Sequence, residues 1–265
     1  MLTKSQNLKG LVIRSSDGEI GSVGEIYFDD QRWVVRYLTV DTGNWLNGRN
    51  VLITPHSILQ TDWTTGRIDV SLTRKQIENA PDIDTQRPVS RQQEAEYYGY
   101  YGYPYYWQGP YIWGPSYSPG GMVPMWEAQS TTEARVDKGS GDSHLRSTKA
   151  VTGYRIQTQD GEIGHIEDFL VDDEAWAIRY LEVDTTNWWP GKKVLLSPDW
   201  VESVSWGESK VFVAVTREAI QNCPEYLDSV PVTREYENKL YFHYGQAPYW
   251  IEAEKQQSAF AASGA

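Results

Sequence analysis

Short apolar segments separated by turn-forming residues recur along the first part of the chain. An Asp-Gly pair, Asp17-Gly18, stands between two apolar segments, and a second polar turn follows at residues 29–31. An Asp-Gly pair favours a tight hairpin, because glycine accepts the positive φ that such a turn needs. This pattern predicts antiparallel strands on both sides of each turn.

A long strand is predicted from Trp33 to Asp41, where β-branched and aromatic residues are frequent. Both faces of this strand are largely apolar, which places it between two layers or inside a closed barrel. Shorter strands are predicted at residues 51–53 and 68–72.

A short helix is predicted after these strands. Thr73 can accept a hydrogen bond from the backbone of Gln76, whose side chain can reach back, and Pro81 ends the helix. About five or six short strands in so few residues favour a small barrel or a rolled sheet, since a flat sheet would leave open edges.

The same pattern occurs a second time. The segment GLVIRSSDGEIG, which starts at Gly10, aligns with GYRIQTQDGEIG, which starts at Gly153, and the alignment continues without a gap through VLITP and VLLSP. The chain is therefore interpreted as a tandem duplication of one small all-β domain. Residues that are identical in the two copies include Asp17, Gly18, Trp33, Arg36, Asp41 and Trp45, which match Asp160, Gly161, Trp176, Arg179, Asp184 and Trp188.

An aromatic stretch, YYGYYGYPYYW at residues 97–107, follows the first domain. It has a counterpart, YFHYGQAPYW, after the second domain, with Trp107 matching Trp250. We therefore interpret both stretches as C-terminal arms of the repeat. Glycine and proline recur too often in residues 97–126 for a helix or a central strand.

The arms divide the chain into four predicted parts. These are a first barrel at residues 1–96, an aromatic arm and flexible linker at 97–147, a second barrel at 148–238, and a C-terminal arm and tail at 239–265. The arms either pack across a barrel or form a low-complexity tract that is prone to self-association. In the first case the extra aromatic residues of the first arm would form an adaptable contact surface.

The chain is acidic, with 265 residues, a net charge of −12 and a pI of about 4.8, and its basic residues are scattered. Such a charge repels phosphate backbones, so nucleic-acid binding is not expected. No apolar segment has the length of a membrane span or the form of a signal peptide. We expect a cytoplasmic protein without a transmembrane segment.

No catalytic or cofactor-binding pattern is present in the sequence. The four histidines lack metal-ligand spacing and favour surface or loop positions. The single cysteine, Cys223, is typical of a small buried side chain at a helix end. We expect no enzyme activity, no cofactor and no metal centre. The acidic turns at residues 29–30 and 172–173 allow two interpretations, a cation site or ordinary turn chemistry.

A structural polar cluster is predicted in each copy. Arg36 and Arg179 lie in the middle of a strand among apolar neighbours, and an arginine there needs a partner. Asp41 and Asp184 follow on the same strands, so we expect them to supply the ion pairs or hydrogen bonds.

An interaction surface is predicted from aromatic residues in loops and arms. Trp45 and Trp188 follow polar loop residues, and Arg49, Lys192 and Lys193 supply the cations that accompany aromatic residues in interface hot spots. The alternative is that these tryptophans fold over the barrel end and plug it. The predicted surface comprises Trp45, Trp188, Trp189, Tyr101, Tyr105, Tyr106, Trp107 and Trp113.

The order of these motifs resembles the PRC-barrel family. The motifs D-G-E-I-G, R-Y-L-x-V-D-T-x-N-W, G-[RK]-x-V-L-[IL]-[ST]-P and T-R-x-x-I each occur twice, over residues 5–85 and 148–228. The family includes the cytoplasmic barrel of the photosynthetic reaction centre H subunit and the C-terminal barrel of the ribosome maturation factor. The resemblance implies two small six-stranded barrels that act in binding and assembly, with no catalytic residues to carry over.

Two functions are therefore expected. The first is a non-catalytic scaffold that binds a protein partner or associates with itself. The second is a peripheral accessory of a photosynthetic reaction centre or of another membrane electron-transfer complex. A small-ligand carrier is a third interpretation, which needs a pocket that the sequence does not show.

Overall fold

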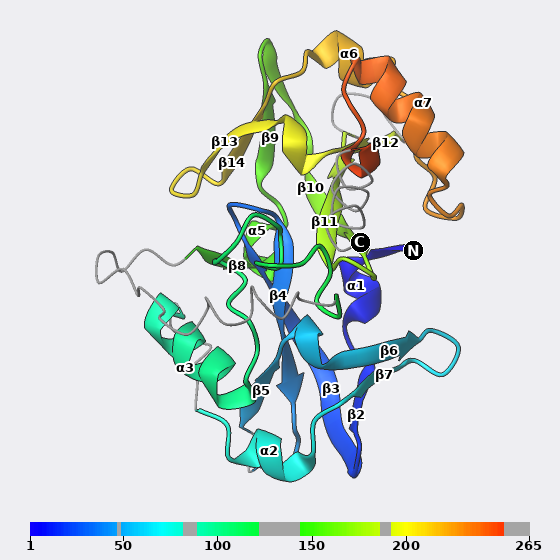
Figure 1. Cartoon of the computed structure of the whole chain (residues 1–265). Coiled ribbons are helices and arrows are strands. Elements are labelled where there is room, and N and C mark those ends of the chain that lie inside the picture. Colours follow the sequence, from blue (N-terminus) through cyan, green and yellow to red (C-terminus); the bar gives the residue numbers. More distant parts are fainter. Residues whose placement is uncertain (47–48, 82–88, 122–143, 186–191, 252–265) are drawn as a thin grey trace, which may run out of the picture. The chain divides into compact units, whose positions relative to one another are not determined.

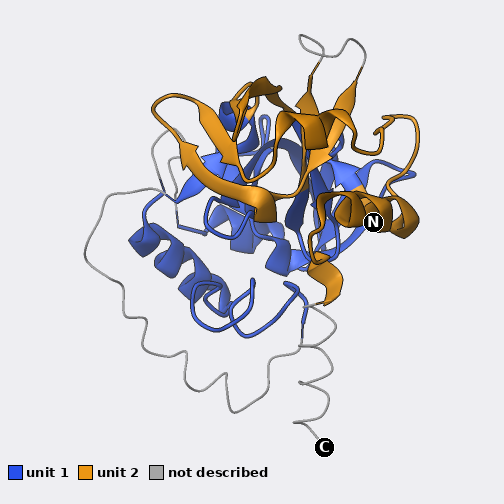
Figure 2. Cartoon of the chain, turned by 90° about the horizontal axis from the view of Figure 1, so that it is seen from above, with its two compact units in different colours: residues 1, 3–151, 168–179 blue, residues 2, 152–167, 180–265 orange. Residues whose placement is uncertain are grey.

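The computed structural model describes residues 1–46, 49–81, 89–121, 144–185 and 192–251. These residues belong to two compact units (Figure 2). Unit 1 comprises residues 1, 3–151 and 168–179, and unit 2 comprises residues 2, 152–167 and 180–265.

The sheet of unit 1 has the strand order β6-β7-β2-β3-β4 (Figure 1). β2 and β7 run parallel, while the other neighbours run antiparallel; β5 pairs with β4, and β8 pairs with β3. The strands are β2 (Val12–Ser15), β3 (Gly18–Asp29), β4 (Val34–Asp41), β5 (Asn50–Ile53), β6 (Ile58–Asp62), β7 (Arg67–Val70) and β8 (Leu145–Ser147). The helices are α1 (Ser5–Leu8), the 3-10 helix η1 (Pro55–Ser57), α2 (Arg74–Glu78), α3 (Arg91–Tyr101) and α5 (Thr148–Val151).

The second copy repeats this order of pairing. Its strands follow the order β13-β14-β9-β10-β11, with β12 on β11, and β1 (Leu2–Lys4) pairs with β10. The strands are β9 (Arg155–Thr158), β10 (Gly161–Asp172), β11 (Ala177–Asp184), β12 (Lys193–Leu196), β13 (Val201–Ser205) and β14 (Lys210–Val213). The helices are the 3-10 helix η3 (Pro198–Trp200), α6 (Arg217–Gln221) and α7 (Arg234–Tyr244).

Unit 1 also contains residues 168–179, which form the tip of the β10–β11 hairpin of the second copy. Within unit 1, Val35 N donates to Trp176 O at 2.7 Å, and Ile178 N donates to Trp33 O at 2.7 Å. The compact units therefore do not follow the two sequence copies. In addition, the predicted boundary between residues 96 and 97 falls inside α3.

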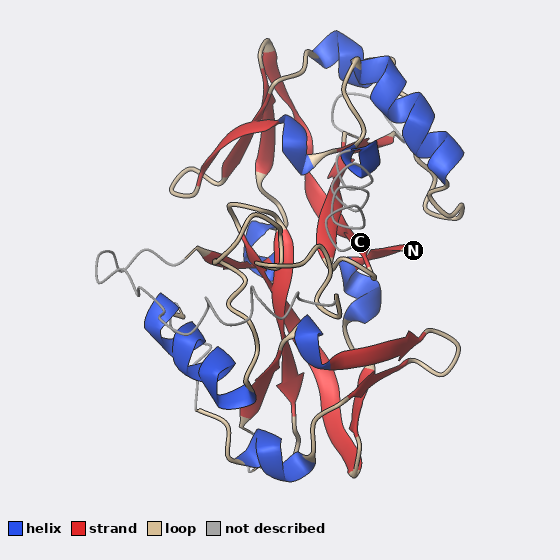
Figure 3. Ribbon diagram, in the orientation of Figure 1, coloured by secondary structure: helices blue, strands red, loops and turns tan. Residues whose placement is uncertain are grey.

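The prediction of small all-β domains, each closed by a short helix, is confirmed in that strands predominate in both copies (Figure 3). Residues 34–40 of β4 are all buried, as expected for a strand that is covered on both faces. Thr73 and Gln76 form the predicted capping box, with Gln76 N donating to Thr73 Oγ1 and Thr73 N donating to Gln76 Oε1. In α6, Thr216 accepts from Ala219 N in the same way.

The prediction that residues 97–126 form no helix is wrong for residues 97–101, which are the end of α3. Ser90 and Gln93 form a capping box at the start of this helix, and Gly102 ends it in the left-handed conformation, with φ 72°. The helix tolerates its internal Gly99 because Tyr97 and Tyr98 are buried against the barrel.

Candidate functional site

A buried ion pair joins the acidic turn to the centre of β4. Arg36 is 0% exposed, and its Nη2 lies 2.8 Å from Asp29 Oδ2. The other carboxylate oxygen of Asp29 accepts from the backbone amides of Gln31 and Arg32, which closes the turn. Burial raises the pKa of Asp29, but the Arg36 charge and these hydrogen bonds outweigh it, so the pKa is below its usual range.

The predicted pairing of Arg36 with Asp41 is wrong. Asp41 is exposed, and its Oδ1 accepts from Gly43 N at 2.9 Å. The two side chains lie on opposite faces of β4, because they are an odd number of positions apart in a strand. Arg179 likewise pairs with Asp172, at 2.9 Å. The acidic turns thus serve turn closure and ion pairing.

The arm of unit 1 covers the arginine. Arg36 Nη1 donates to Ile112 O at 2.7 Å, and its guanidinium lies 3.8 Å from the ring centre of Tyr106 and 4.8 Å from that of Trp113. Trp113 is also 0% exposed, and its Nε1 donates to Ala175 O at 2.7 Å. Cation–π contacts of this kind satisfy a guanidinium that has been removed from water.

A second buried polar cluster was not predicted. Glu94, on α3, accepts from the hydroxyl groups of Tyr37 at 3.1 Å and Tyr106 at 2.7 Å. Arg91 Nη1 and His144 Nε2 lie 3.1 and 3.0 Å from its other oxygen. Burial and the Glu94 charge raise the pKa of Tyr37 and of Tyr106 well above the usual value. In unit 2, Glu237 accepts from Tyr180 and Tyr249 at 2.9 and 3.0 Å.

The predicted interaction residues of the first arm fall into two groups. Tyr106 and Trp113 are buried inside unit 1, so they offer no surface to a partner. Tyr101, Tyr105 and Trp107 are half-buried, and the Tyr105 and Trp107 rings stack on each other at 4.8 Å. The described part of this arm therefore packs on its own barrel. This agrees with the interpretation of a packed arm and not with that of a low-complexity tract.

His56 and His144 are more enclosed than a surface position implies. His56 packs on the Tyr103 ring at 5.2 Å, and its Nδ1 lies 2.8 Å from Pro119 O. Burial lowers the pKa of His56 to about 4.

Cys223 is buried, as predicted. Within the described ranges, no three His, Cys, Asp or Glu side chains gather as metal ligands would.

The cations expected beside the loop tryptophans have structural partners. Arg49 Nη2 donates to the C-terminal carbonyl oxygens of α2, at 3.4 Å from Ile77 O and 3.3 Å from Glu78 O. Lys192 caps α6 in the same way. Lys193 lies 2.9 Å from each of three carboxylates, those of Glu167, Glu182 and Asp228. These contacts fix helices and strands and leave little cationic surface for a partner.

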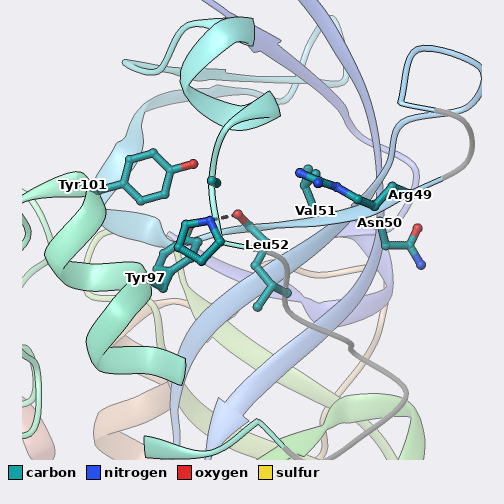
Figure 4. Close-up of a pocket in the computed structure, with 8 residues that line it drawn as sticks. Arg49, Asn50, Val51, Leu52, Tyr97 and Tyr101 are labelled. Carbon is teal, nitrogen blue, oxygen red and sulfur yellow. Dashed lines mark hydrogen bonds between the residues drawn. The ribbon is translucent and has the colours of Figure 1, made fainter. Parts of the chain in front are cut away.

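A small pocket lies beside Arg49 in unit 1 (Figure 4). Tyr97 and Tyr101 of α3 form one side of it, and Leu52 of β5 accepts a hydrogen bond from the Tyr97 hydroxyl at 2.8 Å. The pocket has room for about one water molecule, which is too little for an organic ligand.

Trp45 lines an open groove beside Asp41, the last residue of β4. The groove has a volume of about 380 Å³. Arg74 lies over the half-buried Trp45 ring, with its guanidinium carbon 4.4 Å from the ring centre, and the ring lines the groove. The lining residues are Val12, Glu19, Ile20, Gly21, Ser22, Asp41, Thr42, Gly43 and Trp45. Trp188 and Trp189 lie outside the described residues.

The groove combines an apolar floor with a polar rim. Ile20 is buried and Val12 is half-buried, whereas Glu19 and Asp41 are exposed. The backbones of β3 and β4 approach each other closely beside the groove. A Cβ on Gly21 would lie only 1.9 Å from Asp41 O. Such a surface can hold part of another molecule.

Comparison with known families supports the resemblance that the sequence motifs indicated. The model of the PRC-barrel domain matches residues 4–77 and 148–220, which together are more than half of the chain. Among curated proteins, none matches this sequence. None of the described helices combines the length and the apolar character needed to cross a membrane. The chain belongs to the PRC-barrel family and carries two copies of the domain.

Proposed function

We propose that this protein is a non-catalytic binding or scaffold protein, and that it contacts a protein partner through the Trp45 groove of unit 1. The observation that carries the proposal is the half-exposed Trp45 ring, held by Arg74 beside an open groove. Tryptophan is among the residues most enriched in interface hot spots, where a fixed ring fills a complementary surface.

The burial of the first arm supports the choice of this groove. Tyr106 and Trp113 of that arm are enclosed by their own barrel, where Tyr106 contacts both Arg36 and Glu94 and Trp113 contacts Arg36. They would have to leave that position, and expose a buried ion pair, before they could contact a partner. The groove needs no such rearrangement.

A photo-crosslinking experiment tests the proposal. The photoreactive residue p-benzoylphenylalanine replaces Trp45 in one variant and Leu59, which is 68% exposed on β6, in a control variant. We expect a specific adduct from native lysate only with the variant at position 45. Equal labelling at both positions, or no adduct at position 45, would contradict the proposal.

The same experiment addresses the alternative function. The soluble and membrane fractions of the lysate are treated separately. An adduct found only in the membrane fraction would favour a peripheral accessory of a membrane complex, and an adduct in the soluble fraction would favour a cytoplasmic scaffold. We propose no nucleic acid, cofactor or metal as part of either function.

A further inference from the structure

The two copies differ in sequence at three groove-lining positions, and the change at Val12 introduces a guanidinium. In unit 2, Arg155 Nη1 lies 3.5 Å from Glu162 Oε2. Glu162 is the counterpart of Glu19, and Arg155 is the counterpart of Val12. The second copy therefore places a guanidinium within ion-pair distance of this carboxylate, where the first copy has a neutral side chain; in exchange, the ladder partner of the carboxylate is Gln157 in the second copy and Arg14 in the first.

The acidic rim of unit 1 lacks this internal cation. Among the described residues, none brings a cation within ion-pair distance of Glu19. Arg14 lies across the ladder from Glu19, but it also neighbours Asp69 on β7, with which it is paired in register. Arg74 lies over Trp45. Glu19 and Asp41 therefore remain exposed carboxylates beside an apolar floor.

We propose that the Trp45 groove binds a lysine or arginine side chain from a basic segment of the partner protein. This inference rests on the proposed function and names the chemistry of the partner. The charged group takes the place that Arg155 has in unit 2, beside Glu19, and Asp41 adds a second carboxylate. Its methylene stem lies against Val12 and the Trp45 ring, because long cationic side chains bury their stems on apolar surface.

Peptide binding to the full chain tests the inference. The probe is a fluorescein-labelled peptide of about ten residues with four arginines and two leucines in a glycine–serine background. In the comparison peptide each arginine is replaced by glutamine. We expect the arginine peptide to bind at least about tenfold more tightly at low salt, and to weaken as salt is added.

Matched variants separate the groove from the general acidity of the chain. The pair Glu19→Gln and Asp41→Asn removes two charges from the rim, and the pair Glu202→Gln and Glu218→Gln removes two exposed charges from unit 2. We expect about a tenfold loss of affinity with the first pair and less than about twofold with the second. Equal losses would show non-specific attraction and would overturn the inference.

Val12 provides a second test that adds a side chain instead of removing one. Val12→Arg copies the arrangement of unit 2 and should block the peptide, whereas Val12→Leu keeps an apolar floor and should retain binding. Urea unfolding confirms that both variants are folded. Retention of full affinity by Val12→Arg would overturn the inference.

These experiments distinguish failure of the inference about a cationic side chain from failure of the proposed binding function. If position 45 crosslinks to a partner but the arginine peptide binds no better than the glutamine peptide, the groove is an interface with other chemistry. The inference then fails while the proposed function stands. If position 45 captures nothing and the peptide does not bind, both fail.

Discussion

Arg36 and Asp29 form an ion pair inside unit 1, in which Nη2 lies 2.8 Å from Oδ2 and neither side chain is more than 5% exposed. Asp29 lies opposite Val34 in the β3–β4 ladder, so its side chain is on the face that also carries Arg36, two residues further along β4. The pair links turn, strand and arm, since the same guanidinium also reaches Ile112 O.

Breaking this pair should be strongly destabilising. Asp29→Leu leaves the buried Arg36 charge without a counterion, so we expect the free energy of unfolding to fall by about 3–5 kcal/mol, measured by urea denaturation. The matched control is Asp172→Leu, whose pair with Arg179 is partly exposed and should cost less. Equal small losses in both variants would mean that the buried pair contributes little.

Gly21 should tolerate no side chain. A Cβ there would lie 1.9 Å from Asp41 O, and β3 and β4 would have to separate to admit it. We expect Gly21→Ala to lower the free energy of unfolding by about 3 kcal/mol or more, as measured in urea. Gly207→Ala is the control, because its Cβ would meet no atom within 4 Å. If Gly21→Ala and Gly207→Ala had the same midpoint of thermal or urea unfolding, the close approach of β3 and β4 at Gly21 would be contradicted.

Local signals in the sequence account for much of the fold. The Thr73–Gln76 capping box could be read from residue types and spacing alone, because each partner lies within one turn of the chain. The same rule applied to Ser90 and Gln93 would have identified α3, which the many glycines beyond them concealed. The period of two along a strand would likewise have excluded Asp41 as the partner of Arg36.

Other features could not be predicted from local pattern. His144 reaches Glu94 and Tyr106 from a distant part of the chain, and residues 168–179 of the second copy complete unit 1. Such contacts depend on which surfaces meet after folding, and neither propensity nor spacing encodes that choice. Placing Trp45 on a groove also required the strand approach at Gly21, which is a tertiary feature.

His56 should make the stability of unit 1 depend on pH. Burial lowers its pKa to about 4, against about 6.5 in the unfolded chain, so the unfolded state binds more protons between these values. Stability is therefore fully present above about pH 6.5 and is lost as the pH falls toward 4, by at most about 1.4 kcal/mol per pH unit. Urea midpoints measured across this range should show the slope.

Two histidine variants test the origin of that slope. His56→Gln cannot bind the proton, so its stability should change less between pH 6.5 and 4 than that of the unchanged protein. His165→Gln, in β10, serves as the comparison and should keep the slope. A slope that persists in His56→Gln would assign the effect to other groups.

Trp113 should hold the first arm on its barrel. Its ring is fully buried against Arg36 and His56, and its indole N–H donates to Ala175 O. We expect Trp113→Ala to lower the free energy of unfolding by about 3–5 kcal/mol and to speed proteolytic cleavage between residues 97 and 117, whereas the half-buried Trp107→Ala should have a smaller effect on both. Rapid cleavage of this segment in the unchanged protein would contradict the packed arm. It would also return the aromatic rings to the surface, where they would compete with the Trp45 groove as the site of recognition.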